Sequence, residues 1–79
     1  MQVLIEVNSE VVFRKADYDQ MVSEICQLIE KNGAITAAQV RDHFNTSRKY
    51  SLGLLEHLDL IGVTLREGDY RRLRSNNKE

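Results

Sequence analysis

The sequence predicts an α+β domain of the winged-helix type, the variant of helix-turn-helix in which a β-hairpin wing follows three helices. Three observations predict it: a β-rich hairpin opens the chain, three stripes of apolar residues at helical spacing occupy its middle, and a second β-rich hairpin closes it. In this fold the third helix and the wing normally meet nucleic acid. The fold alone leaves DNA, RNA and protein open as partners.

The first part of the chain predicts a hairpin and a long helix. Leu4–Val7 and Val11–Phe13 are β-rich runs separated by the turn-forming residues 8–10. From about Lys15 the apolar residues follow the spacing of a core-facing helix, which Asn32-Gly33 should end. The apolar stripe of this helix consists of Tyr18, Met21, Val22, Ile25, Cys26, Leu28 and Ile29.

Two shorter helices should follow, joined by a connection of a few residues. The segment Ile35–Gln39 should open the second helix, with Thr36 as its cap and Gln39 returning a hydrogen bond to the capping residue. Asn45 should close this helix, and Thr46 or Ser47 should cap the third. The apolar set of the third helix is Tyr50, Leu54, Leu55, Leu58 and Ile61.

The predicted wing begins after Gly62, which should stop the third helix. Val63–Arg66 alternates like a strand, residues 67–69 form a tight turn, and Tyr70–Leu73 is the returning strand. We therefore expect one domain over residues 1–74. Residues 75–79 contain no apolar side chain to bury, so we expect them to form a disordered tail.

Length and composition limit the class of protein. The chain has 79 residues, enough for one domain, and no apolar run near the roughly 20 residues of a membrane span. Its start lacks the pattern of a signal peptide. Cys26 is the only cysteine, so no internal disulfide can form, and a cytoplasmic location fits. Its place on the helical stripe predicts a core residue, not a reactive thiol.

Charge is unevenly distributed along a chain whose net charge is only −1. Residues 1–32 carry three basic and six acidic side chains, and residues 33–62 carry three of each. Residues 63–79 carry five basic and three acidic side chains. A basic end on an otherwise acidic domain can face one polyanion, which favours a nucleic-acid partner.

The segment Thr46-Ser47-Arg48-Lys49 places two cations in the first turn of a helix. Because a helix N-terminus already carries partial positive charge, these cations cost the free protein a few tenths of a kcal/mol. The arrangement becomes favourable when a phosphate arrives, since backbone amides and both cations then face one anion. We therefore expect this segment to contact phosphate; an idle solvated pair is the alternative.

The wing carries four arginines, Arg66, Arg71, Arg72 and Arg74. Strand alternation puts Arg72 and Arg74 on one face and Arg71 on the other, and pairing around the turn should bring Arg66 near Arg71. Arginine suits phosphate, a guanine edge or an exposed base, so we expect recognition. The alternative is a hairpin kept soluble by charge.

Three other polar residues near these clusters receive structural interpretations. We expect Asp69 to cap the wing turn or hold a neighbouring arginine, and Tyr50 to lie in the core. Tyr70 either stacks on a base or packs under the wing. His43 and His57 lack the spacing of metal ligands, and no catalytic motif occurs, so we expect no enzyme activity, no metal and no cofactor.

Several of these segments together resemble one family over roughly residues 3–74. They are Thr46-Ser47-Arg48-Lys49-Tyr50, Leu54-Leu55-Glu56, Leu58-Asp59, Thr64, Arg66, Gly68-Asp69 and Arg71. In this combination they resemble the last winged-helix domain of the bacterial selenocysteine-specific translation elongation factor. The resemblance implies a module that grips the selenocysteine insertion element, an mRNA hairpin that recodes a UGA stop codon.

The resemblance also assigns roles and partners. Ser47, Arg48 and Lys49 would contact backbone phosphates and an extruded base, while Arg66 and Arg71 would hold the opposite side of the hairpin. The GTPase and tRNA-binding domains of the parent factor, and the ribosome, are implied partners. The chain would then be a monomeric RNA-binding fragment without GTPase activity of its own.

Departures from the family pattern leave alternatives open. Gly53 stands where the family often has proline, which would loosen the third helix, and Leu60 and Leu65 occupy positions that are often basic. A DNA-binding transcription regulator is the first alternative, although the middle of the third helix is poor in base-reading groups. A protein-binding winged helix is the second, with Leu52, Leu60 and Leu65 as its apolar patch if all three are exposed.

Overall fold

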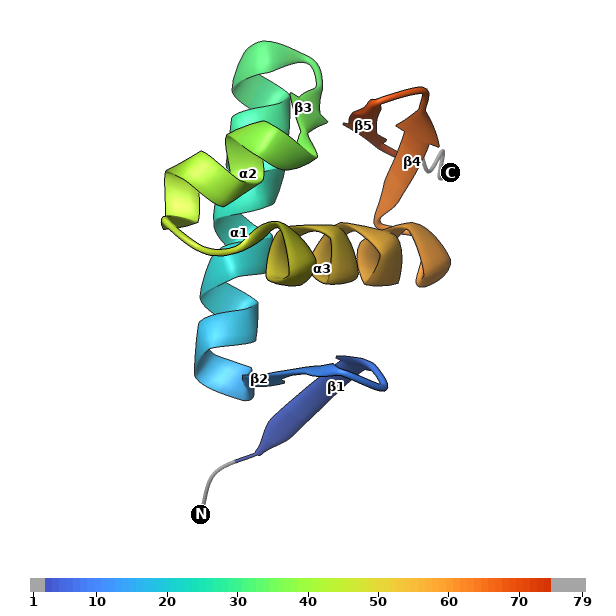
Figure 1. Ribbon diagram of the computed structural model, residues 1–79. Helices are drawn as coiled ribbons and strands as arrows, with labels where there is room; N and C mark the ends of the chain where they lie inside the picture. The colour runs from blue at the N-terminus through green and yellow to red at the C-terminus, as the bar shows by residue number, and fades with distance from the viewer. Residues whose placement is uncertain (1–2, 75–79) are drawn as a thin grey trace.

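Helix α3 crosses the long helix α1, and a β-hairpin lies on either side of α3 in the computed structural model (Figure 1). The structure describes residues 3–74, and the predicted disordered tail, residues 75–79, lies outside them. The predicted α+β winged-helix class is confirmed, with three helices between two hairpins. In chain order the elements are β1 (Leu4–Asn8), β2 (Val11–Arg14), α1 (Lys15–Asn32), β3 (Ile35–Thr36), α2 (Ala37–Phe44), α3 (Arg48–Leu60), β4 (Thr64–Glu67) and β5 (Tyr70–Leu73).

The helices begin and end where local chemistry predicts. Gly33 closes α1 with a φ of 88°, a left-handed conformation that a glycine adopts without steric cost. Thr36 and Gln39 form the predicted capping box, in which the amide of each residue donates to the side chain of the other at 2.8 and 3.2 Å. Asn45 closes α2 with a φ of 52°, and Ser47 caps α3.

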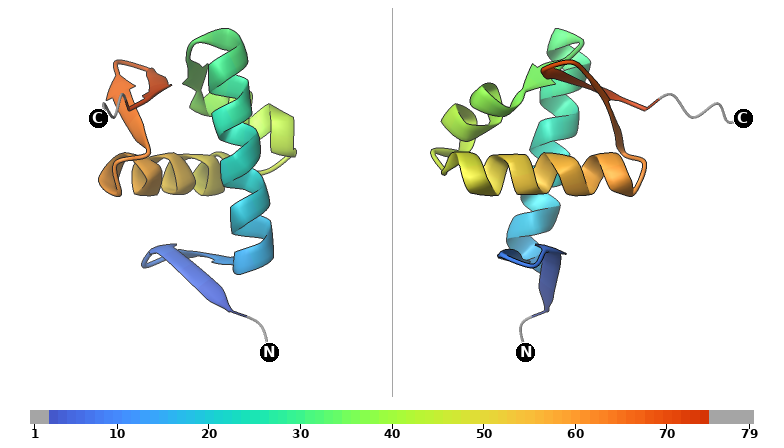
Figure 2. Two further views of the ribbon diagram at one scale, coloured as in Figure 1. Left: turned by 180° about the vertical axis from the view of Figure 1, so that it is seen from behind. Right: turned by 45° about the vertical axis from the view of Figure 1, so that its right-hand side comes forward.

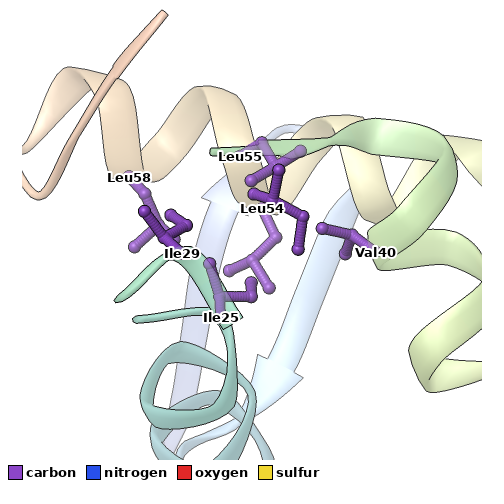
Figure 3. Packing of buried hydrophobic residues seen from close by; sticks show 7 residues of the cluster. Ile25, Ile29, Val40, Leu54, Leu55 and Leu58 are labelled. Atoms are coloured by element: carbon purple, nitrogen blue, oxygen red, sulfur yellow. The ribbon is translucent and has the colours of Figure 1, made fainter. Parts of the chain in front are cut away.

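The core joins all three helices. Seven buried side chains converge on one cluster, which Figure 3 shows from close by. They are Ile25 and Ile29 of α1, Ile35 of β3, Val40 of α2, and Leu54, Leu55 and Leu58 of α3. Burial of each contributes about 1.5–3 kcal/mol, so this cluster fixes the angles between the helices and with them the position of the wing.

Gly53 lets the N-terminal hairpin pack directly on α3. A Cβ atom at this position would lie 3.0 Å from Asn8 Nδ2 and 3.4 Å from Cγ2 of the fully buried Val11. We expected Gly53 to loosen α3, but the helix runs unbroken from Arg48 to Leu60. The absent side chain instead provides room for the hairpin.

The wing belongs to a three-stranded sheet with the order β3-β5-β4. Ile35 and Thr36, predicted as the opening of α2, form the strand β3 and pair with Arg71 and Tyr70 of β5. Two residues are too few to show a β periodicity, so this strand could not be predicted from the sequence. Because Thr36 also caps α2, the strand ties the start of α2 to the wing.

Two expectations about burial are wrong. Cys26 is only partly buried and is not part of the core cluster, although burial, followed by the nearby Glu30 carboxylate, raises the pKa of its thiol. Tyr50 is 39% exposed. Its ring packs edge-on against Phe13 with centroids 6.1 Å apart, so it covers the outside of the junction between α3 and the N-terminal hairpin.

Candidate nucleic-acid interface

A hollow of about 410 Å³ lies where the starts of α2 and α3 face the wing. The right-hand view of Figure 2 shows α2 and the wing on the same side of α3. Four of the lining residues are arginines, contributed by α2, α3, β4 and β5. The full lining is Thr36, Ala37, Ala38, Arg41, Arg48, Leu52, Arg66, Asp69 and Arg71.

The start of α3 presents Arg48 to this hollow. Ser47 caps the helix by accepting a hydrogen bond from the Tyr50 amide at 3.3 Å, and its carbonyl accepts a bond from Ser51 Oγ at 2.9 Å. The first turn contains no acidic residue. The partial positive charge of the helix end and the Arg48 guanidinium therefore add in one place, which suits an anionic ligand.

Thr46 and Lys49 lie apart from Arg48, although the three are close in sequence. Lys49 Nζ is 3.5 Å from Glu10 Oε1, in the turn of the N-terminal hairpin. Thr46 lines a different depression, together with Phe13 and residues of α1. The predicted basic segment thus points to two sides of α3, and of its two cations only Arg48 lines the hollow.

On the wing, the predicted proximity of Arg66 and Arg71 is confirmed, since these two residues are paired in the β4–β5 register. Both line the hollow. Arg66 is exposed, and its Nε donates to the Gly68 carbonyl at 2.9 Å, which holds the side chain along the turn. Arg71 is only 2% exposed, which the sequence did not indicate.

Arg71 is held by a carboxylate at the end of α3. Its Nε donates to Asp59 Oδ2 at 3.2 Å, and Thr64 Oγ1 donates to Asp59 Oδ1 at 2.5 Å. One carboxylate therefore joins α3 to both wing strands. These three residues belong to the motif that carries the resemblance, and here they are a structural unit that fixes the wing against α3.

Arg72 and Arg74 lie outside the lining of the hollow. Arg72 Nη1 is 3.1 Å from Glu67 Oε1, and both side chains are more than half exposed. Arg74 is exposed beyond the end of β5, near Gly62. The four wing arginines thus divide into two that line the hollow, Arg66 and Arg71, and two that do not, as strand alternation predicted.

Arg41 of α2 is a residue of the site that the sequence patterns did not indicate. It lines the hollow together with Ala37 and Ala38 of the first turn of α2, which lie on the same face of the helix three and four residues earlier. That spacing was visible in the sequence. The proximity of α2 to the wing was not, because it depends on β3.

The remaining polar candidates have mixed outcomes. Asp69 lines the hollow, but within residues 3–74 its side chain makes none of the observed hydrogen bonds or ion pairs; the Gly68 carbonyl holds Arg66 instead. Tyr70 is 54% exposed, so it does not pack under the wing. His57 Nε2 is 2.9 Å from the Tyr18 hydroxyl, and His43 Nε2 is 2.8 Å from Glu24 Oε1. No group of three metal-ligating side chains occurs in the described part of the chain.

Comparison with known proteins identifies the family. The family described as "Elongation factor SelB, winged helix" matches residues 27–73, more than half of the chain. The chain belongs to the SelB winged-helix family. The selenocysteine-specific elongation factor of Desulfomicrobium baculatum is 32% identical over 72 residues, and that of Haemophilus influenzae is 36% identical over 53 residues. These matches cover 91% and 67% of the chain but only 11% and 9% of the relatives, so the chain spans about a tenth of their length.

A solved SelB structure shares the fold. The mRNA-binding domain of elongation factor SelB from E. coli, solved in complex with SECIS RNA, matches with a TM-score of 0.83 and 27% identity. The match covers 92% of this chain and 60% of that one. Among residues 3–74 of this SelB winged helix, no helix is long and apolar enough to cross a membrane.

Proposed function

We propose that this winged helix binds an mRNA hairpin of the selenocysteine insertion type and holds a selenocysteine-specific elongation factor to its message for UGA recoding. One observation carries the proposal: arginines from four elements converge on one hollow at the start of α3. The E. coli SelB domain that shares this fold is described in complex with SECIS RNA, which supports RNA as the polyanion. The module has no catalytic role in this proposal.

The arginines of the hollow would form the centre of the interface. Arg48 and Arg66 are exposed and can reach RNA phosphates or stack on an extruded base. Ser47 and Lys49 would extend the contact along the start of α3. Arg71 would act mainly by holding the wing, because its guanidinium is buried against Asp59.

The outer residues would contribute less. Arg72 and Arg74 lie outside the hollow and could meet phosphates only where the hairpin extends past the wing. Thr46 faces α1 and the N-terminal hairpin, so we expect the smallest contribution from it. The interface is thus graded, with the strongest contacts at the hollow and weaker electrostatic contacts around it.

The surface of α3 favours RNA over duplex DNA as the partner. A helix that reads the major groove presents several polar side chains along its length. The middle of α3 instead buries its side chains, including Ser51, Leu54 and Leu55, and Glu56 is the exposed residue that follows. Binding at the start of the helix, where RNA can present splayed-out bases, fits this surface better.

A purely protein-binding role has less support. Leu60 and Leu65 are 84% and 48% exposed, but Leu52 is half-buried in the wall of the hollow. The three leucines therefore do not form the single exposed patch that this alternative requires. Polar and cationic residues dominate the lining of the hollow.

The wider setting follows from the family. Residues 1–74 would act as one monomeric domain attached to the GTPase and tRNA-binding domains of the factor, which works on the ribosome in the cytoplasm. Recognition of the hairpin by this domain would raise the concentration of the factor near the UGA codon. The hydrolysis of GTP would take place outside this chain.

An electrophoretic shift assay tests the proposal. The 79-residue chain should bind an insertion-element hairpin at least about tenfold more tightly than a scrambled RNA or a duplex DNA of equal length, at one salt concentration. Equal affinity for all three nucleic acids would contradict the proposal, because it would reveal a general polyanion binder.

A further inference from the structure

We infer that the hollow is a seat for one phosphate group and that α2 is a third RNA-contacting element, through Arg41 and the amides of Ala37 and Ala38. The proposed function assigns RNA contacts by residue only on α3, its cap and the wing; this inference adds α2 and rests on the proposed function only for the source of the phosphate, a backbone phosphodiester of the hairpin. Free inorganic phosphate shares the same chemistry and can test the seat alone.

The first observation is an unsatisfied donor. Arg71 lies in the wall of the hollow and is 2% exposed. Its Nε donates to Asp59, but Nη2 is buried without a hydrogen-bond partner in the part of the chain that the structure describes. Leaving a buried donor unsatisfied costs about 1–3 kcal/mol, and more for a charged group. An oxyanion in the hollow would place acceptors beside this guanidinium.

The second observation is the start of α2, which is eight residues long. The first amides of a helix have no carbonyl partner within it. Thr36 caps the amide of Gln39, which leaves the amides of Ala37 and Ala38 free to donate to a ligand. Both alanines line the hollow, and their short side chains leave the backbone open to an anion.

The charges around the hollow fit a single phosphate. The four lining arginines have three carboxylate neighbours: Asp69 in the lining, Asp59 bound to Arg71, and Asp42 beside Arg41. The remaining excess of one positive charge matches the single negative charge of a phosphodiester. Asp69 opposes binding in part and limits the seat to one anionic group.

Arg41 can exchange its present partner for a phosphate in the hollow at little cost. Its present partner is the adjacent Asp42, at 3.3 Å, and the two side chains are 43% and 74% exposed. An exposed pair of this kind contributes about 0–1 kcal/mol. A phosphate flanked by the start of α2 and by Arg48 is a stronger partner, because charge-assisted bonds from several donors act together.

Titration of the isotope-labelled 79-residue chain with inorganic phosphate, followed by NMR, tests the seat. Sodium chloride at matched ionic strength is the reference. We expect saturable shifts at the amides of Ala37 and Ala38 and at the Nε–H of Arg71, with Arg41→Gln weakening the affinity at least about threefold. Arg14→Gln is the matched control, because Arg14 is also exposed and paired with a nearby aspartate but does not line the hollow. Unchanged amides at Ala37 and Ala38, or equal effects of the two variants, would overturn the seat.

A parallel titration with the hairpin separates this inference from the proposed function. We expect Arg41→Gln to weaken hairpin binding about fivefold and Arg14→Gln to leave it unchanged. If the hairpin binds but neither phosphate nor Arg41→Gln has an effect, the seat is wrong and the proposed function stands. If phosphate binds at the hollow but the hairpin does not bind at all, the assignment of the phosphate to RNA is overturned.

Discussion

The neighbouring residues Arg71 and Arg72 of β5 each pair with a carboxylate. The two pairs have similar distances but differ in how far their side chains are exposed to solvent. Arg71 is 3.2 Å from Asp59, and Arg72 is 3.1 Å from Glu67. The side chains of the first pair are 2% and 24% exposed, whereas those of the second are 57% and 51% exposed. Water screens the second pair and not the first, so equal distances describe unequal energies.

The comparison also separates two kinds of contribution to binding. The inner pair joins α3 to both wing strands and lines the hollow, so a change there alters the shape of the interface. The outer pair lies outside the hollow on the solvent face of the wing, so a change there alters only local charge. Proximity in sequence therefore predicts little about role.

Removal of the arginine from the inner pair, Arg71–Asp59, should give the largest effect on stability. We expect Arg71→Met to lower the free energy of unfolding by about 2–3 kcal/mol, because the partly buried Asp59 carboxylate loses its cation. Urea denaturation of the chain measures this change. The same substitution at the outer position, Arg72→Met, should change stability by less than about 0.5 kcal/mol. Similar losses in the two variants would show that burial does not distinguish the pairs.

For binding affinity we expect the largest effect at Arg48, an exposed arginine of the hollow that contributes little to stability. We expect Arg48→Ala to cost about 1–3 kcal/mol of affinity for the hairpin while leaving the unfolding free energy nearly unchanged. Calorimetric titration measures the first quantity and urea denaturation the second. A loss of stability equal to the loss of affinity would mark Arg48 as a structural residue and shift the interface elsewhere.

The salt dependence of binding should show whether Arg66, the exposed wing arginine that lines the hollow, contacts a phosphate. With roughly four phosphates neutralised, the log–log slope of affinity against salt should be near −3 for an RNA target. Arg66→Gln should cost about 1 kcal/mol and make the slope less negative by about 0.7, the value of one phosphate contact. An unchanged slope in this variant would mean that Arg66 contacts no phosphate.

Most of the fold was predictable because the chain follows local rules. Helix spacing, the capping box of Thr36 and Gln39, and the turn around Gly68 are each visible within a few residues of sequence. The two-residue strand β3 was not predictable, since it exists only through pairing with residues about 35 positions away. Missing β3 also meant missing that α2 borders the wing.

The site was only partly predictable for a related reason. Alternation showed that Arg71 and Arg72 face opposite ways, but the strand Tyr70–Leu73 does not show which face is inward. The answer lies in Asp59, twelve residues earlier on another element, whose carboxylate allows a guanidinium to be buried. Arg41 was overlooked because nothing local distinguishes it from an ordinary exposed arginine on a helix.

The smallest predicted effect is the decisive test of the comparison between the two pairs. A double-mutant cycle with Arg72→Ala and Glu67→Ala should give a coupling energy below about 0.5 kcal/mol, because both side chains are more than half exposed. The cycle with Arg71→Ala and Asp59→Ala should give at least three times as much. In the outer pair any coupling should fade in 1 M salt, since exposed charges are screened there, whereas the inner coupling should persist. A large, salt-resistant coupling between Arg72 and Glu67 would mean that the outer face is also an ordered part of the wing, and the distinction between binding and scaffolding arginines on β5 would then be lost.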